Sequence, residues 1–253
     1  MFPAPAIQYK GAATRHAGQQ SPAVGIGAPA GLAGEDQADV HAHANHLAGG
    51  HWLRDQTGAP LVIGARIGDV KRVFAPRFAM DDLANDGRQF DMLLEEGATL
   101  PPGNLTVRVL QTAACVTYII GDAAFVGDTL LMPDYGTPPC DFPGGDAAML
   151  HVSIQKILAL PPETRIFVGR DYLPAGRSDC ACETSVAAQK AGNIHVHDGV
   201  SADDFIAMRR ARDATLALPL LILPNLQVNI ATGELPPADA KGRRFLRLPL
   251  QGV

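Results

Sequence analysis

Three histidines fall within six residues, in the stretch Asp-Val-His-Ala-His-Ala-Asn-His-Leu-Ala-Gly-Gly. His41 and His43 are two positions apart and His46 follows three positions later, so a loop at the end of a strand can turn several imidazoles toward one ion. The pattern favours a metal site on a folded scaffold over three surface histidines in an alanine-rich turn. The carboxylate that is usual in such a cluster is replaced by Asn45, whose amide carries no charge to balance a divalent cation.

The size and charge of the chain exclude some classes of function. Its 253 residues suit one large domain or two small ones, with enough chain for a substantial core. The formal net charge is −5, and no run of lysine and arginine occurs. Both observations argue against nucleic acid or an anionic membrane surface as the main partner.

The four cysteines form neither a zinc-type pair nor a disulfide framework. Cys180 and Cys182 make a Cys-x-Cys pair, which is a weak sign of metal or redox chemistry, while Cys115 and Cys140 lie apart. We expect all four to be reduced in a cytoplasmic protein. No secretory signal opens the chain and no apolar run reaches membrane-spanning length, so the sequence predicts a soluble protein that is not exported.

Strands in the first part of the chain and helices toward its end predict an α+β fold. Residues 1–39 are rich in Pro and Gly without a sustained helical period, and we expect an irregular segment there. The apolar residues 221–230 include Pro224 and are predicted to form a loop packed on the body. Strands are predicted at 61–64, 89–94, 105–111, 115–120, 124–126 and 165–168, and helices at 46–57, 146–158, 183–190 and 201–216. This order favours a layered sandwich over a regular βαβ winding.

A second chemical signal lies in the middle of the chain. Asp128 follows the predicted strand 124–126 in Gly-Asp-Thr-Leu, where a carboxylate at the end of a strand can project into a cleft. Gly-Asp-Thr is also ordinary turn chemistry, so both interpretations stay open. His195 and His197 alternate with a valine, and we interpret them as structural or surface residues.

Several stretches, taken in order, resemble one known family. They are His-Ala-His-Ala-Asn-His-Leu, Ala-Cys-Val-Thr-Tyr-Ile-Ile-Gly-Asp-Ala-Ala-Phe-Val-Gly-Asp-Thr-Leu, Cys-Asp-Phe-Pro-Gly-Gly-Asp-Ala, Asp-Tyr-Leu-Pro-Ala-Gly-Arg and Asn-Ile-His-Val-His-Asp-Gly-Val. Over residues 40–235 the chain resembles the metallo-β-lactamase superfamily, and within it the persulfide dioxygenases and their glyoxalase-II-related relatives. The resemblance implies a four-layer αββα sandwich with a metal site at one edge of its two sheets. It divides the chain into a shortened N-terminal segment (1–39), the domain itself (40–235) and a C-terminal tail (236–253).

The chain departs from the family pattern at its metal-binding motifs. The motif His-x-His-x-Asp-His has Asn45 at its aspartate. The family's Pro-Gly-His-Thr segment is missing, because the chain reads Gln-Thr-Ala-Ala-Cys over residues 111–115. The last family histidine, just before Asp-Tyr, is Arg170, and the arginine before Cys-Asp-Phe is Pro139. The bridging aspartate of the family survives as Asp128.

These departures decide how many ions the resemblance allows. The persulfide dioxygenases hold one iron through two histidines and one aspartate. Of that set the chain keeps His41 and Asp128, and His43 is the nearest substitute for the second histidine, with His46 able to reach a neighbouring position. Arg170 places a fixed positive charge where a neutral imidazole would bind, which disfavours a second cation. We therefore expect one ion at most.

The resemblance also assigns residues around the metal. Tyr172 and Asp141 match positions that the family places near the site, so Tyr172 joins Asp128 as a predicted catalytic residue. Arg170 or Arg177 can hold a carboxylate of a glutathione-like substrate, although a solvated surface charge is the alternative for each.

The function implied is that of a persulfide dioxygenase. One Fe(II) would serve to oxidise a glutathione persulfide with dioxygen, giving sulfite and glutathione. Two alternatives stay open: a degraded relative that has lost its metal, and a zinc-dependent thioesterase-like hydrolase. The expected partner is a small thiol or persulfide, and the resemblance suggests a homodimer.

Overall fold

The computed structural model describes residues 37–38, 42, 47–80, 83, 86–101, 105–113, 116–140, 145–216 and 221–249. These residues fall into two compact units. The first unit takes its described residues from 26–94 and 217–253, and the second from 95–216. Apart from residues 37–38, the predicted irregular segment 1–39 lies outside the described residues, and the predicted division at 39 and 235 stays a prediction.

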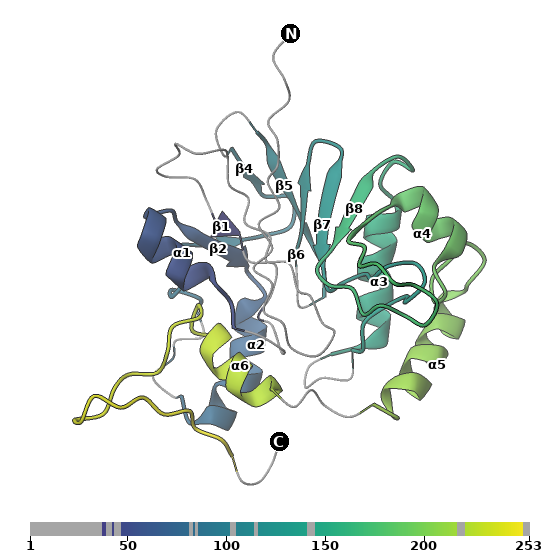
Figure 1. The fold of residues 1–253 in the computed structure, drawn as a ribbon. Coiled ribbons are helices and arrows are strands. Elements are labelled where there is room, and N and C mark those ends of the chain that lie inside the picture. The colour runs from purple at the N-terminus through teal and green to yellow at the C-terminus, as the bar shows by residue number, and fades with distance from the viewer. Residues whose placement is uncertain are drawn as a thin grey trace. The chain divides into compact units, whose positions relative to one another are not determined.

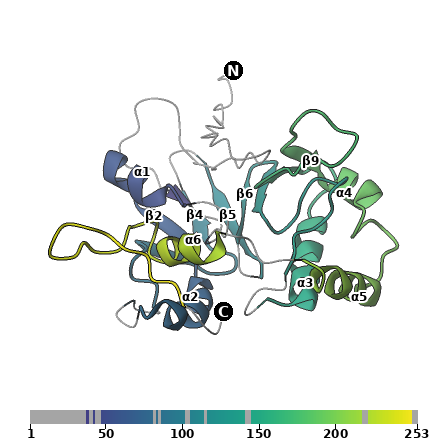
Figure 2. The same cartoon turned by 60° about the horizontal axis from the view of Figure 1, so that its bottom comes forward.

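The first unit is built on a short parallel sheet. Its strands β1 (Gln37–Ala38), β2 (Leu61–Gly64) and β3 (Met92–Leu94) pair in that order. All four residues of β2 are buried, as expected for the central strand of a parallel sheet, and the strand predicted at 61–64 is confirmed. Helices α1 (Gly50–Thr57), α2 (Ile67–Phe74) and α6 (Ile222–Asn229) and the 3-10 helix η1 (Pro76–Phe78) complete the unit, and Figure 2 shows α1, α2 and α6 beside the sheet.

Helix α6 corrects the loop that was predicted at 221–230. Pro224 is the third residue of this helix, where a missing N–H costs nothing because the first turn has no intrahelical acceptor for it. The helix is tied into its unit by side-chain amides. Asn229 Oδ1 accepts from the Ala48 N–H at 2.8 Å, and Gln227 exchanges two hydrogen bonds with the backbone of Arg247.

The second unit holds the larger sheet. Its strand order is β4 (Thr99–Leu100), β5 (Val107–Gln111), β6 (Val116–Ile120), β7 (Ala123–Gly127), β8 (Arg165–Val168) and β9 (Glu183–Ser185). Only β7 and β8 run parallel; the other pairs are antiparallel. The strands predicted in this region are confirmed, but the helix predicted from residue 183 is wrong over its first turn. Residues 183–185 pair with β8, and helix α4 (Val186–Gly192) begins after them.

Helices α3 (Ala147–Leu158), α4 and α5 (Ala202–Asp213) lie together on one side of this sheet (Figure 1). Side chains cap two of their starts, at the predicted first residues of these helices: Asp146 Oδ1 accepts from the Met149 N–H, and Ser201 Oγ accepts from the Asp204 N–H. The buried core between helices and sheet includes Ile154 and other fully enclosed apolar side chains: Ala124, Val126, Ile157, Ile166, Val168 and Phe205. No helix within the described ranges is both long and apolar enough to cross a membrane.

Candidate active site

Asp128 lies directly after β7, where the strand is bent by a bulge. The register with β8 shifts between Phe125 and Gly127, so β7 carries one extra residue, Val126, two positions before Asp128. Gly127 has a φ of +54°, a left-handed conformation that a residue without Cβ adopts at little cost. Bulges of this kind redirect the next side chain. The Gly-Asp-Thr sequence thus combines both interpretations: β7 ends at Gly127, and the Thr129 N–H closes a turn by donating to the Val126 carbonyl at 3.1 Å.

Gly169 lies against this carboxylate. Its N–H donates to the Gly127 carbonyl at 2.8 Å. A Cβ built on Gly169 would stand 2.9 Å from Asp128 Oδ1 and 2.9 Å from the Gly127 carbonyl carbon, closer than real contacts allow. Sequence reasoning missed this residue, because a single glycine between a strand and an arginine gives no local sign of the contact.

Arg170 forms a forked ion pair with Asp128. Its Nε donates to Oδ1 at 3.0 Å and its Nη2 lies 2.6 Å from Oδ2. The arginine side chain is 7% exposed and the aspartate 21%. Burial opposes the charge on Arg170, but the adjoining Asp128 carboxylate raises the pKa of the guanidinium above its ordinary value. The position that the family gives to a histidine therefore holds a permanent cation, fixed on the surviving aspartate.

Tyr172 extends this pair. Its hydroxyl accepts from Arg170 Nη1 at 3.2 Å, and its ring stacks on Tyr135 with 4.7 Å between centroids. Burial raises the pKa of the Tyr172 phenol, which outweighs the lowering effect of the Arg170 charge. The phenol is protonated at neutral pH and can donate a hydrogen bond next to Asp128.

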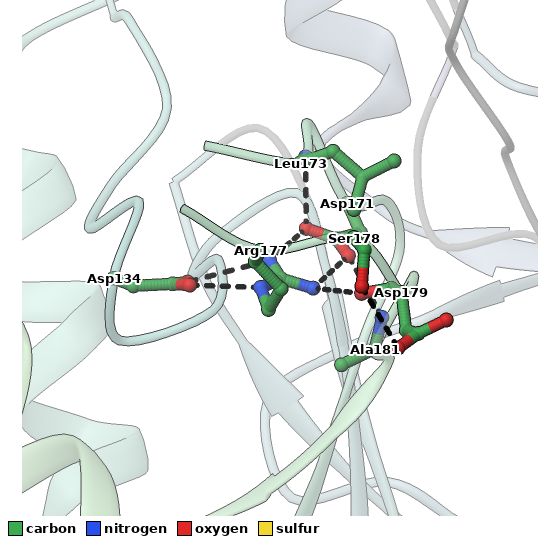
Figure 3. Close-up of polar contacts among 7 residues, drawn as sticks. All are labelled: Asp134, Asp171, Leu173, Arg177, Ser178, Asp179 and Ala181. Atoms are coloured by element: carbon green, nitrogen blue, oxygen red, sulfur yellow. Dashed lines mark hydrogen bonds and ion pairs between the residues drawn. The ribbon is translucent and has the colours of Figure 1, made fainter. Parts of the chain in front are cut away.

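Arg177 is also engaged by carboxylates. Its guanidinium lies between Asp134 and Asp171 and donates to the Asp179 carbonyl as well, as Figure 3 shows. Burial acts to raise the pKa of Asp171, but hydrogen bonds from Arg177 and then from backbone N–H groups hold it below its usual range. Both arginines predicted to bind substrate are thus paired with the chain's own carboxylates, and their contact with substrate stays a prediction.

The other predicted metal ligands are the histidines of residues 41–46. His41, His43 and His46 lie outside the described residues, and so do Asn45 and Asp141. Among the residues that are described, no group of three or more His, Cys, Asp or Glu side chains is arranged to hold a metal ion. The ligand roles predicted for the histidines therefore stay predictions.

The hairpin β5–β6 explains the missing family histidine. Gln111 pairs with Val116, so only residues 112–115 connect the two strands, and the sequence Thr-Ala-Ala-Cys contains no imidazole. The hairpin end lies beside the candidate site, because the buried hydroxyls of Thr112 and Thr129 are 3.2 Å apart. Residues 112–115 therefore supply no histidine ligand beside Asp128.

The pairing of Asp128 with Arg170 decides how many metal ions the site can hold. Two cations do not fit, because Arg170 already places a positive charge on both oxygens of the aspartate that would bridge them. One cation fits better, since a carboxylate offers about four acceptor positions and Arg170 uses two. Asp128 would then be the negative ligand, and the imidazoles would have to come from residues 41–46.

His195 and His197 were predicted to be structural or surface residues, and the structure agrees. His195 is buried, and its Nδ1 accepts from the Thr137 N–H at 3.0 Å. Burial, followed by the charges of Arg209 and Arg212, lowers the pKa of His195 to about 4, so this residue is a neutral structural acceptor. His197 is exposed.

Comparison with known proteins places the chain in a family. Residues 41–170 match the family model of the metallo-beta-lactamase superfamily. A probable metallo-hydrolase of Burkholderia pseudomallei is 45% identical over 85% of this chain and 78% of its own length. A beta-lactamase hydrolase-like protein of Agrobacterium fabrum is 46% identical over 87% of this chain, which spans about half (52%) of that relative.

A solved structure agrees with this assignment. ETHE1 from Myxococcus xanthus superposes with a TM-score of 0.62 at 29% identity, over 79% of this chain and 78% of its own. The predicted α+β fold class of the superfamily is confirmed, and so is the likeness to its persulfide dioxygenase-like branch. The chain belongs to the metallo-β-lactamase superfamily.

Proposed function

We propose that this protein is a one-metal member of the superfamily that oxidises a glutathione persulfide, with Fe(II) held by His41, His43 and Asp128. The observation that carries the proposal is the forked pair between Arg170 and Asp128. It puts a protein cation where a second metal ion would otherwise balance the bridging carboxylate. The likeness to ETHE1 supports the persulfide dioxygenase branch over the two-metal hydrolases.

The chain's own residues have distinct tasks in this reaction. Iron, when bound, supplies the site at which a persulfide sulfur and dioxygen can meet. Arg170 balances the charge of Asp128 and holds both of its oxygens in a fixed direction. Tyr172 offers a phenol proton to a neighbouring acceptor, and its stacking on Tyr135 holds the ring in place. Asp141 stays a predicted substrate contact.

A metal-free relative is the second candidate, and a specific observation favours it. The β5–β6 hairpin closes at the pair of Gln111 and Val116 and removes the family's second iron ligand. If His43 does not replace that ligand, Asp128 and His41 are too few metal ligands to hold an ion. The fold would then persist with a thiol ligand or a protein partner and without turnover.

A zinc hydrolase is the third candidate. Two relatives carry hydrolase names, and their whole-protein activities reach this chain only as a hypothesis. A thioesterase of this type needs a second metal, which the charge of Arg170 disfavours.

Metal analysis of protein purified without chelator separates the three candidates. We expect about one iron per chain, together with oxygen consumption that depends on glutathione persulfide. Two zinc ions would favour the hydrolase, and no metal would favour the degraded relative. Asp128→Asn should abolish iron binding, and His43→Ala should do the same if His43 is the substitute ligand. The predicted homodimer is a separate matter, to be checked by light scattering.

A further inference from the structure

Two loops of the second unit carry the described part of the candidate site. The β7 loop is residues 128–136, and the β8 loop is residues 169–181. Three consecutive residues of the β8 loop each connect to the β7 loop. Arg170 pairs with Asp128 and Tyr172 stacks on Tyr135, while the residue between them, Asp171, is linked through Arg177.

Arg177 makes the middle connection with both edges of its guanidinium (Figure 3). Toward the β7 loop, Nε donates to Asp134 Oδ2 at 2.8 Å and Nη2 to Oδ1 at 3.4 Å. Toward its own loop, Nη1 and Nη2 donate to the two oxygens of Asp171, each at 2.5 Å, and Nη1 also donates to the Asp179 carbonyl at 2.8 Å. A planar fork can serve two carboxylates at once, which an ammonium group cannot do with the same geometry.

Asp171 is the point at which this connection acts on the site. Its side chain is only 5% exposed, and it accepts from the backbone N–H groups of Leu173 and Ala181 in addition to Arg177. The carboxylate therefore closes the β8 loop upon itself. Because Asp171 shares peptide bonds with both Arg170 and Tyr172, a shift of Asp171 relative to the β7 loop moves both of these side chains relative to Asp128.

We infer that Arg177 is a positioning residue: by joining Asp134 to Asp171 it sets the place of Arg170 on Asp128 and of the Tyr172 hydroxyl beside it. The inference rests on the proposed function insofar as Asp128 is taken as the working carboxylate. Displacements of about 1 Å at such a site are enough to lower turnover strongly. In this role Arg177 acts through two aspartates and needs no contact with the substrate.

The alternative is that Arg177 stabilises only its own loop. Asp134 separates the two roles, because it contributes nothing to the closure of the β8 loop and is half-exposed on the β7 loop. Asp134→Asn leaves the contacts of Arg177 with Asp171 and Asp179 in place. It weakens only the link between the loops.

The Nε–H group of Arg170 reports its own position in a proton–nitrogen correlation spectrum of the full chain. In the wild type this proton should exchange slowly with water, because it donates to Asp128 from a buried side chain. Its signal is identified by its loss in Arg170→Lys. We expect Asp134→Asn and Arg177→Gln each to speed this exchange about tenfold, the factor expected from losing a charge-assisted hydrogen bond. Arg177→Lys should restore little, because it lacks the fork.

Arg165→Gln is the matched control. Arg165 makes a forked pair with the exposed Glu183 in the same sheet and has no link to the β7 loop, so its loss should leave the Arg170 signal unchanged. An Arg170 signal that is undisturbed in Asp134→Asn overturns the positioning role, whatever Arg177→Gln does to the melting temperature.

The iron content of the same preparations keeps the two proposals apart. Accelerated Arg170 exchange in a protein that binds no iron supports the positioning role and contradicts the proposed function. Normal iron content with unchanged exchange in Asp134→Asn contradicts the positioning role alone.

Discussion

Two arginine–aspartate pairs of the second unit differ in what surrounds the carboxylate. Arg209 and Asp213 on α5 are 1% and 4% exposed, whereas Arg170 and Asp128 are 7% and 21% exposed. Asp213 receives Arg209 Nε at 2.9 Å and Nη2 at 2.5 Å on one oxygen, and the Cys140 N–H at 2.9 Å on the other. These contacts all come from a side chain of α5 and from the backbone of Cys140.

The difference separates a structural pair from a pair that a ligand can reach. Arg209 also donates to the Thr137 carbonyl, so its pair with Asp213 anchors α5 to the segment 137–140. Asp128 stands at a strand end, beside a bulge and a glycine, with part of its carboxylate open to solvent. We propose that the first pair contributes mainly to stability and the second mainly to function. The following predictions test that division.

The largest expected effect is on the enclosed pair. Asp213→Ala leaves the Arg209 guanidinium buried without its carboxylate, and it should lower the free energy of unfolding by about 3–5 kcal/mol. Urea denaturation measures this loss. The double variant Arg209→Met with Asp213→Leu should recover more than half of it, because it removes both buried charges. A loss below about 1 kcal/mol in the single variant would show that the pair is not structural.

A smaller effect is expected where the backbone approaches Asp128. Gly169→Ala places a methyl group against Asp128 Oδ1 and the Gly127 backbone, so one of them must move. Overpacking of this kind costs about 1–3 kcal/mol in unfolding free energy. The same variant should reduce metal occupancy, because Asp128 is the part most able to shift. Gly192→Ala, at a position where an added Cβ meets nothing, is the control for glycine replacement.

The network around Arg209 also predicts a pH effect. Burial lowers the pKa of His195 to about 4 from its ordinary value of 6.5, so the unfolded chain takes up a proton below pH 6.5 that the folded chain does not. The contribution of His195 to the free energy of unfolding is therefore fully present above pH 6.5. It falls as the pH is lowered toward 4, by at most about 1.4 kcal/mol per pH unit. His195→Asn, which keeps an acceptor for Thr137, should flatten this part of the curve of unfolding free energy against pH. His197→Asn, on the exposed neighbour, should not.

The fold was predictable wherever the signal is local. The strand at 61–64 was predicted correctly because it is a compact apolar run, and the strand at 165–168 because three apolar residues follow Arg165. The starts of α3 and α5 were predicted correctly because Asp146 and Ser201 are residue types that cap helices. Helix α6 was missed because Pro224 was interpreted as a helix breaker, although it lies in the first turn. Strand β9 was missed because three residues pair only through a distant partner, β8.

The site was less predictable for the same reason. Asp128 stood out at a strand end, but its pairing with Arg170 spans 42 positions and that of Arg177 with Asp134 spans 43. No local pattern encodes such contacts. The resemblance places Arg170 at a lost metal ligand, whereas the structure shows what the side chain does instead: it pairs with Asp128, the remaining predicted ligand.

The smallest expected change in stability, and the sharpest test of the comparison, is at Arg170 itself. Arg170→Met removes a buried cation and leaves Asp128 partly solvated, so the free energy of unfolding should fall by only about 1 kcal/mol. Affinity for a divalent cation should rise, because the competing positive charge next to Asp128 is gone; titration calorimetry with Zn²⁺ measures it. Arg165→Met, at an exposed pair, should change neither quantity. If Arg170→Met instead destabilises the protein as much as Asp213→Ala and leaves Zn²⁺ binding unchanged, the two pairs belong to one structural class, and Asp128 is held in place for the fold alone.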